Sequence, residues 1–230
     1  ALVLQIRDGL ALIEADLRAT IKGFAAMAEK QRDTVMAGRT HLQHALPVTF
    51  GYKVAVWLNP LITALERLEQ LRPRVLRLGF GGASGTLASL GDQGLPVARE
   101  LARELGLIEA DIPWHVARDG VAEVACWLGV LCGSLSKIGT DVMLLMQTEL
   151  AEVAEPHVPK RGGSSTMPQK RNPIACEYIL AQARGVHALV PQMLSAMAHD
   201  LERGTGPWQA EALALPQAFL LTHGAVAQAR

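Results

Sequence analysis

The sequence is poor in aromatic residues and carries no net charge. Only 4% of its 230 residues are aromatic although half are hydrophobic, and the apolar content is mainly Ala, Leu and Val. That composition favours packed helices over a β-sandwich. The 22 basic residues balance the 22 acidic ones, so no basic face announces a nucleic-acid partner. Any preference for an anion must therefore be local.

Cysteine is also scarce, and no metal-ligand spacing is present. The three cysteines are odd in number and form no CxxC pair, which predicts buried thiols in a reducing, cytoplasmic compartment rather than disulfides or a zinc site. The histidines outside the motif described below show no ligand spacing with acidic residues, so no metal is expected. These cysteines and histidines are Cys126, Cys132 and Cys176, and His44, His115, His157, His187, His199 and His223.

No apolar run is long enough to predict a membrane span. The least charged stretch, residues 124–136, is flanked by Glu123 and Lys137 and is shorter than the roughly 20 residues that cross a bilayer. It predicts a core helix and no membrane partner. The N-terminus has no initiating Met and no signal design, so we interpret the chain as a fragment that begins within a helix.

Apolar residues recur at steps of three and four, which predicts long amphipathic helices. In the first, over residues 2–32, these positions are Leu2, Ile6, Leu10, Ile13, Leu17, Ile21, Phe24 and Met27. Further helices are predicted over residues 49–78, 96–105, 117–153, 174–198 and 209–230, with Pro60 and Pro73 as kinks or ends.

The stretches between the predicted helices are irregular, and none shows the alternation of a strand. Residues 33–47 break the helical pattern, residues 79–85 form a glycine-rich turn, and residues 106–114 form a loop. We therefore expect an all-α fold, an extended bundle over residues 1–230 with some helices about 45 Å long. Its apolar faces exceed what one chain covers, so we expect oligomerisation.

A loop at residues 162–173 could bind an anion. Its sequence, Gly-Gly-Ser-Ser-Thr-Met-Pro-Gln-Lys-Arg-Asn-Pro, cannot continue the preceding helix. It offers hydroxyls, an ammonium and an amide without any carboxylate. Lys170 and Asn172 are two residues apart, so an extended loop would present both to one side, where they could stabilise a carboxylate or its enolate.

This loop resembles the signature Gly-Ser-Ser-x-Met-Pro-x-Lys-x-Asn-Pro of the fumarase, aspartase and adenylosuccinate lyase superfamily. Residues 38–51, Gly-Arg-Thr-His-Leu-Gln-x-Ala-x-Pro-x-Thr-Phe-Gly, resemble a second signature of that superfamily. The resemblance implies the central helical domain of the superfamily fold, without its N-terminal and C-terminal domains. It also implies a homotetramer whose active sites combine loops from three subunits, and no cofactor.

The resemblance also implies roles for single residues. Ser164 would transfer a proton, and resemblance rather than spacing favours it over Ser165. His41 would lie in the active site and be hydrogen-bonded by Glu177, which would raise its basicity and fix its tautomer. The substrate-binding residues would be Thr40, Ser165, Lys170, Asn172 and Arg203, although Arg203 could equally pair with Glu202 or Asp200.

The connecting blocks help to choose among members of the superfamily. Residues 80–91, 113–119 and 208–216 look like those of the bacterial 3-carboxy-cis,cis-muconate cycloisomerase family. This implies a small dicarboxylate or tricarboxylate substrate, closed to a lactone in the protocatechuate and β-ketoadipate route of aromatic catabolism. One departure is that some of these cycloisomerases have tryptophan where His41 stands and lack the acid of Glu177.

Two other interpretations stay open. Adenylosuccinate lyase of purine biosynthesis is supported by His41, Glu177 and the run of residues 34–41. The chain could instead be a non-catalytic helical homologue, as some lens crystallins of the superfamily are, or an inactive fragment.

Overall fold

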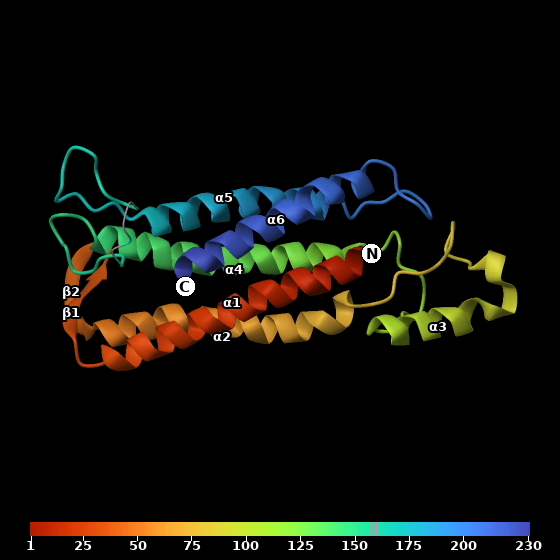
Figure 1. Ribbon diagram of the computed structural model, residues 1–230, viewed down its shortest axis with the longest axis horizontal. Coiled ribbons are helices and arrows are strands. Elements are labelled where there is room, and N and C mark those ends of the chain that lie inside the picture. The colour runs from red at the N-terminus through yellow and green to blue at the C-terminus, as the bar shows by residue number, and fades with distance from the viewer. Residues whose placement is uncertain (157, 159–160) are drawn as a thin grey trace.

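The computed structural model describes residues 1–156, 158 and 161–230 and forms an elongated helical bundle (Figure 1). His157 lies outside the described residues. Five long helices follow the long axis: α1 (Leu2–Lys30), α2 (Phe50–Val75), α4 (Asp119–Leu145), α5 (Ile174–Ser195) and α6 (Pro207–Ala229). A hairpin of β1 (Val35–Thr40) and β2 (Gln43–Thr49) lies at one end, and η1 (Ala88–Gln93) and α3 (Gly94–Leu105) lie at the other.

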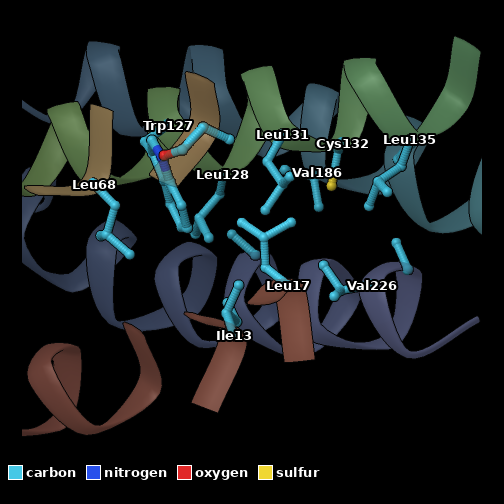
Figure 2. Close-up of a cluster of buried hydrophobic side chains, with 14 of the residues drawn as sticks. Ile13, Leu17, Leu68, Trp127, Leu128, Leu131, Cys132, Leu135, Val186 and Val226 are labelled. Carbon is cyan, nitrogen blue, oxygen red and sulfur yellow. The ribbon is translucent and has the colours of Figure 1, made fainter. Parts of the chain in front are cut away.

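The core follows the apolar periodicity of the helices. In α1, Ile6, Leu10, Ile13 and Leu17 are buried at steps of three and four residues, as the sequence predicts. Side chains of the other long helices meet this stripe, and Figure 2 shows Leu17 beneath Leu128 of α4. Because burying one leucine side chain contributes about 1.5–3 kcal/mol, these rows are what hold the bundle together.

Helix α4 lies in the middle of the bundle, packed against α2, α5 and α6. It is long and apolar enough, by length and composition alone, to cross a membrane. Most of its apolar residues are instead buried among the neighbouring helices, and the Trp127 indole N–H donates to the Ala64 carbonyl oxygen of α2 at 2.9 Å. The prediction of a core helix at residues 124–136 is therefore confirmed.

The hairpin corrects the prediction that no strand occurs. β1 and β2 are antiparallel, from Val35 opposite Thr49 to Thr40 opposite Gln43. Most of their residues are exposed or half-buried, so neither strand buries one face. The sequence therefore lacks the alternation of apolar and polar residues that predicts a strand. Gly38 lies where the register shifts, and a Cβ atom there would stand 2.5 Å from the Leu46 carbonyl oxygen.

The predicted helix over residues 117–153 is too long at its C-terminal end. α4 stops at Leu145, and the chain then turns back so that the Glu152 amide donates to the Leu145 carbonyl oxygen at 3.0 Å. Ala151 takes a positive φ of 48° within this turn. The apolar spacing alone does not reveal the stop, and the segment after it instead places Glu152 and Glu155 against Arg39 and the first amides of α5.

The remaining helix ends lie within one to three residues of their predicted positions. Thr49 is the N-cap of α2, accepting from the Tyr52 amide at 3.1 Å. Neither Pro60 nor Pro73 ends α2, which continues to Val75. Apart from the hairpin, the expected all-α bundle is confirmed.

Candidate active site

Two predicted motifs come together at one end of the bundle. The hairpin that carries Thr40 and His41 and the loop of residues 161–173 both lie at the end where α5 begins (Figure 1). The segment after α4 links the two motifs, because its Glu152 pairs with Arg39 of the hairpin. The helix that bears Glu177 starts at the same end.

His41 sits at the tip of the hairpin in a strained turn. His41 and Leu42 have φ values of 49° and 63°, and a two-residue hairpin turn with two positive φ values normally takes Asn-Gly. Left-handed backbone at a non-glycine residue costs on the order of 1–3 kcal/mol and is concentrated at functional sites. The turn leaves Thr40 and His41 exposed to solvent, which is where a group that meets a substrate or a second chain would lie.

The loop of residues 162–173 is closed at its base. The Asn172 amide donates to the Gly162 carbonyl oxygen at 2.8 Å, and Gly163 and Arg171 form an antiparallel bridge. Gly162 has a φ of 75°, which suits glycine. The loop thus closes on a narrow base, with Ser165 and Lys170 exposed and Ser164 half-buried.

Backbone N–H groups converge on the Ser164 hydroxyl. Its Oγ accepts from the Met167 amide at 3.1 Å and from the Thr166 amide at 3.3 Å, and the Thr166 hydroxyl lies 3.4 Å away. Hydrogen bonds to the charged form of a group favour that form. This arrangement therefore stabilises negative charge on Ser164 Oγ more than on Ser165, for which no such bond occurs in the described part of the loop.

A cationic cavity of about 390 Å³ opens beside the base of the loop. Lys170 and Asn172 of the loop line it, together with Arg161, Arg171 and Arg230. The only carboxylate among its described lining residues is Glu155, which is occupied by the first amides of α5. Lys170 and Asn172 therefore do reach one cavity, and its charge suits an anion; Ser164 does not line it.

The His41–Glu177 pair implied by the resemblance is not formed inside one chain. Glu177 is exposed in the first turn of α5, and no hydrogen bond or ion pair links it to His41 in the described residues. The two side chains lie on different elements at the same end of the bundle. If they meet, the contact is made between copies of the chain.

Arg203 lies apart from the other predicted site residues. It follows α5, whose 22 residues span about 33 Å at 1.5 Å per residue, and so it belongs to the opposite end of the bundle (Figure 1). Its Nε donates to the Ala83 carbonyl oxygen at 3.2 Å and its Nη2 to the Gly82 carbonyl oxygen at 3.1 Å. No hydrogen bond or ion pair links it to Glu202 or Asp200 in the described residues, and Asp200 instead accepts from Thr205.

A second cavity, of about 580 Å³, surrounds Arg203. His115 and Trp208 line it and pack edge to face, with ring centroids 5.0 Å apart. Burial, assisted by the charges of Arg203 and Arg118, lowers the pKa of His115 and keeps its ring neutral. Arg118, which also lines this cavity, forms a buried ion pair with Glu211, each side chain 4% exposed.

Sequence inspection does not find the long-range pairs that organise both ends. Arg39 and Glu152, 113 residues apart, and Arg118 and Glu211, 93 residues apart, are joined by the fold alone. A local signal exists only for Arg39, which lies inside the second signature. No group of three or more His, Cys, Asp or Glu residues in the described part of the chain is arranged to hold a metal ion.

Comparison with known proteins shows the family of the chain. The model of the Lyase_1 family, described as lyase, matches residues 1–187, and the chain therefore belongs to that family. The chain is 52% identical over 228 residues to 3-carboxy-cis,cis-muconate cycloisomerase of Pseudomonas aeruginosa. It is 39% identical over 220 residues to adenylosuccinate lyase of Pyrococcus abyssi.

A solved structure gives the same fold. The crystal structure of the 3-carboxy-cis,cis-muconate lactonizing enzyme of Pseudomonas putida superposes with a TM-score of 0.94 at 49% identity, over 99% of this chain and 51% of that one. The alignment with the Pseudomonas aeruginosa relative covers 99% of this chain and 50% of the relative. The chain is thus a bundle of the fumarase superfamily that spans about half the length of the relatives it matches.

Proposed function

We propose that the protein is a cycloisomerase that converts 3-carboxy-cis,cis-muconate, or a muconate with a similar substituent, to its muconolactone. The observation that carries this proposal is the Ser164 hydroxyl, held by two backbone N–H groups in a loop whose Lys170 and Asn172 line a cationic cavity. The identity of 52% to a protein named for this reaction supports the choice of substrate.

The reaction is intramolecular. A carboxylate oxygen of the muconate adds to a carbon–carbon double bond and forms the C–O bond of the lactone. The electrons of the double bond move toward another carboxylate and give an enolate, which then takes a proton at its α-carbon. No atom is lost and no oxidant is needed, so the protein has to stabilise an anion and deliver one proton.

In this proposal Ser164 transfers the proton at the α-carbon. Lys170 and Asn172 bind the carboxylate that becomes the enolate, where a cation and an amide donor lower the energy of the developing charge. His41 with Glu177 acts as a second acid and base or orients a carboxylate, while Thr40 and Ser165 bind substrate. The donors on Ser164 Oγ favour its deprotonated form relative to a hydroxyl without them.

We further propose that a complete site needs more than one copy of the chain, assembled as a homotetramer. Arg203 is at the end of the bundle opposite to Ser164, so the two can share a substrate only if they come from different copies, as antiparallel packing side by side would allow. Large apolar side chains remain exposed along the helices, among them Leu12, Tyr52, Val56, Leu213 and Leu220. Such faces suit helix packing between copies.

We propose that these residues form the central bundle of a longer cytoplasmic enzyme of aromatic catabolism. The test uses the complete product of the gene with 3-carboxy-cis,cis-muconate, whose loss is followed by ultraviolet absorbance, and adenylosuccinate in a parallel assay. Turnover of the muconate alone supports the proposal. Absence of turnover on both substrates by a folded tetramer would reject it and leave a member of the superfamily with another substrate or none.

Adenylosuccinate lyase is the second candidate. The observation in its favour is that His41 and Glu177 are both retained, since some of the cycloisomerases that resemble this chain keep neither. That reaction breaks a C–N bond by β-elimination, in which the same kind of enolate is formed by proton removal. Turnover of adenylosuccinate and not of the muconate would establish it.

A further inference from the structure

Arg39 and Glu152 form a two-point ion pair between the hairpin and the segment that leads to the 162–173 loop. Arg39 Nη1 donates to Glu152 Oε2 at 2.8 Å, and Nη2 donates to Oε1 at 2.6 Å. The side chains are only 14% and 26% exposed. Parallel bonds of this kind fix orientation as well as distance, and partial burial protects them from screening.

Each partner is attached to a predicted catalytic element. Arg39 lies in β1 directly before Thr40 and His41, so its position sets where the hairpin tip points. Glu152 lies three residues before Glu155, whose carboxylate is bonded to the first amides of α5. The ion pair thus connects the hairpin of His41 to the frame that carries the signature loop and Glu177.

The Nη1 and Nη2 atoms of Arg39 both face protein groups in the orientation it adopts, and only its Nε–H has no partner among the described residues. Besides its two bonds to Glu152, Nη1 lies 3.4 Å from the Ala37 carbonyl oxygen and Nη2 lies 3.4 Å from His44 Nε2. The hydrogen bond from Arg39 lowers the pKa of Glu152, with smaller contributions from His44 and Lys53, so the pair is charged at neutral pH. Arg39 therefore binds other protein groups rather than the substrate.

We propose that Arg39 and Glu152 are positioning residues that fix the direction of the hairpin tip bearing Thr40 and His41, and that neither contacts the substrate. This inference rests on the proposed function of the same site. A lysine cannot replace Arg39, because it supplies one point charge in place of a planar fork. A misplacement of about 1 Å in a catalytic group can lower a rate ~100-fold, so the pair matters for turnover more than for affinity.

The test compares Arg39→Lys, Glu152→Gln and the exchanged double variant Arg39→Glu/Glu152→Arg in the complete gene product. Both single variants should lower kcat about 10- to 100-fold while KM changes less than about twofold, because substrate contacts remain. On a logarithmic scale, the exchanged pair should recover at least half of the decrease in kcat that the single variants show. A rise in KM without a fall in kcat in Arg39→Lys would overturn the inference.

The ion pair of Arg74 and Glu123 is a matched control. It also has two-point geometry and joins two elements, α2 and α4. It lies outside the hairpin and the 162–173 loop, which carry the predicted catalytic residues. Glu123→Gln should change the melting temperature about as much as Glu152→Gln but leave kcat unchanged. Equal effects of the two variants on kcat would assign Arg39 and Glu152 a structural role only.

Two further measurements keep the inference testable if the exchanged pair does not fold or the substrate assignment fails. Glu152→Asp keeps the charge but shortens the side chain, and should lie between the parent and Glu152→Gln in kcat. Amide hydrogen exchange of residues 39–44 needs no substrate, and should accelerate in Glu152→Gln but not in Glu123→Gln. Unchanged exchange would reject the positioning role even if the enzyme proved to act on another substrate.

Discussion

The Glu155 carboxylate accepts the Cys176 amide N–H at 2.8 Å across the base of the signature loop. Its other oxygen accepts the Ala175 amide at 3.1 Å. The first amides of a helix have no partner within it, and an anion beside them also meets the positive end of the helix dipole. A side chain from before the loop therefore caps the helix after it, and holds the two ends of the loop together.

Replacing Glu155 should loosen this loop. Loss of a helix cap costs about 0.5–2 kcal/mol, so we expect Glu155→Ala to lower the free energy of unfolding by that amount. It should also speed proteolysis within residues 161–173, because the loop loses its anchor. Glu155→Gln, which keeps an acceptor without the charge, should have a smaller effect. Urea denaturation and timed proteolysis measure both quantities.

Glu66 provides the control for Glu155. It is exposed on α2, and no hydrogen bond or ion pair involves it in the described residues. Glu66→Ala should leave both unfolding and loop cleavage unchanged. Equal behaviour of the two alanine variants would show that the cap contributes nothing.

Removal of the Ser164 hydroxyl should stop the proton transfer. We expect Ser164→Ala to lower kcat at least ~100-fold, since a positioned acid or base contributes about 10²–10⁴, with an unchanged helical circular dichroism spectrum. Ser134→Ala is a matched change in α4, where the hydroxyl only bonds the Val130 carbonyl oxygen, and should keep the parent kcat. Near-normal turnover by Ser164→Ala would remove this serine from the mechanism.

Mixing two inactive variants tests whether His41 and Ser164 act from different copies. If one site takes His41 from one copy and Ser164 from another, a one-to-one mixture of His41→Ala and Ser164→Ala subunits should regain about a quarter of the activity per site, by random assembly of a symmetric oligomer. The mixture must be unfolded and refolded together so that subunits exchange. If both residues act from the same copy, mixing restores nothing.

The buried thiols make stability fall in alkaline solution. Burial raises the pKa of Cys132 from 9.0 to about 11, against a small opposing bond to Thr222. Because the folded-state pKa is raised, the stabilisation is fully present below pH 9 and is lost as the pH rises toward 11. The loss should be about 3 kcal/mol, at 1.4 kcal/mol per pKa unit.

Cys132→Ala separates this thiol from other groups that titrate at high pH. The difference in unfolding free energy between the parent and Cys132→Ala should shrink between pH 8 and pH 11. Cys176, whose pKa is raised to about 12 by burial and by Glu155, should resist alkylation over the same range. A pH-independent difference would mean that the Cys132 thiolate is not disfavoured in the folded protein.

Much of the fold could be predicted from the sequence because helices are local. The spacing of Ile6, Leu10 and Ile13 specifies the buried face of α1 before any partner is known. The long helices and the irregular loop at 162–173 follow from the same local signals. The two signature motifs also identify candidate residues, whose roles stay predictions.

Only the tertiary structure decided where those residues lie. It puts Ser164, Lys170 and His41 at one end of the bundle and Arg203 at the other, since α5 separates them by its own length. It ends α4 at Leu145, after which Glu152 binds Arg39 and Glu155 binds the Cys176 amide. Periodicity in the sequence shows which face of a helix is apolar. Pairs such as Arg39 and Glu152 form only when the helices pack, so their positions in the sequence do not predict that they meet.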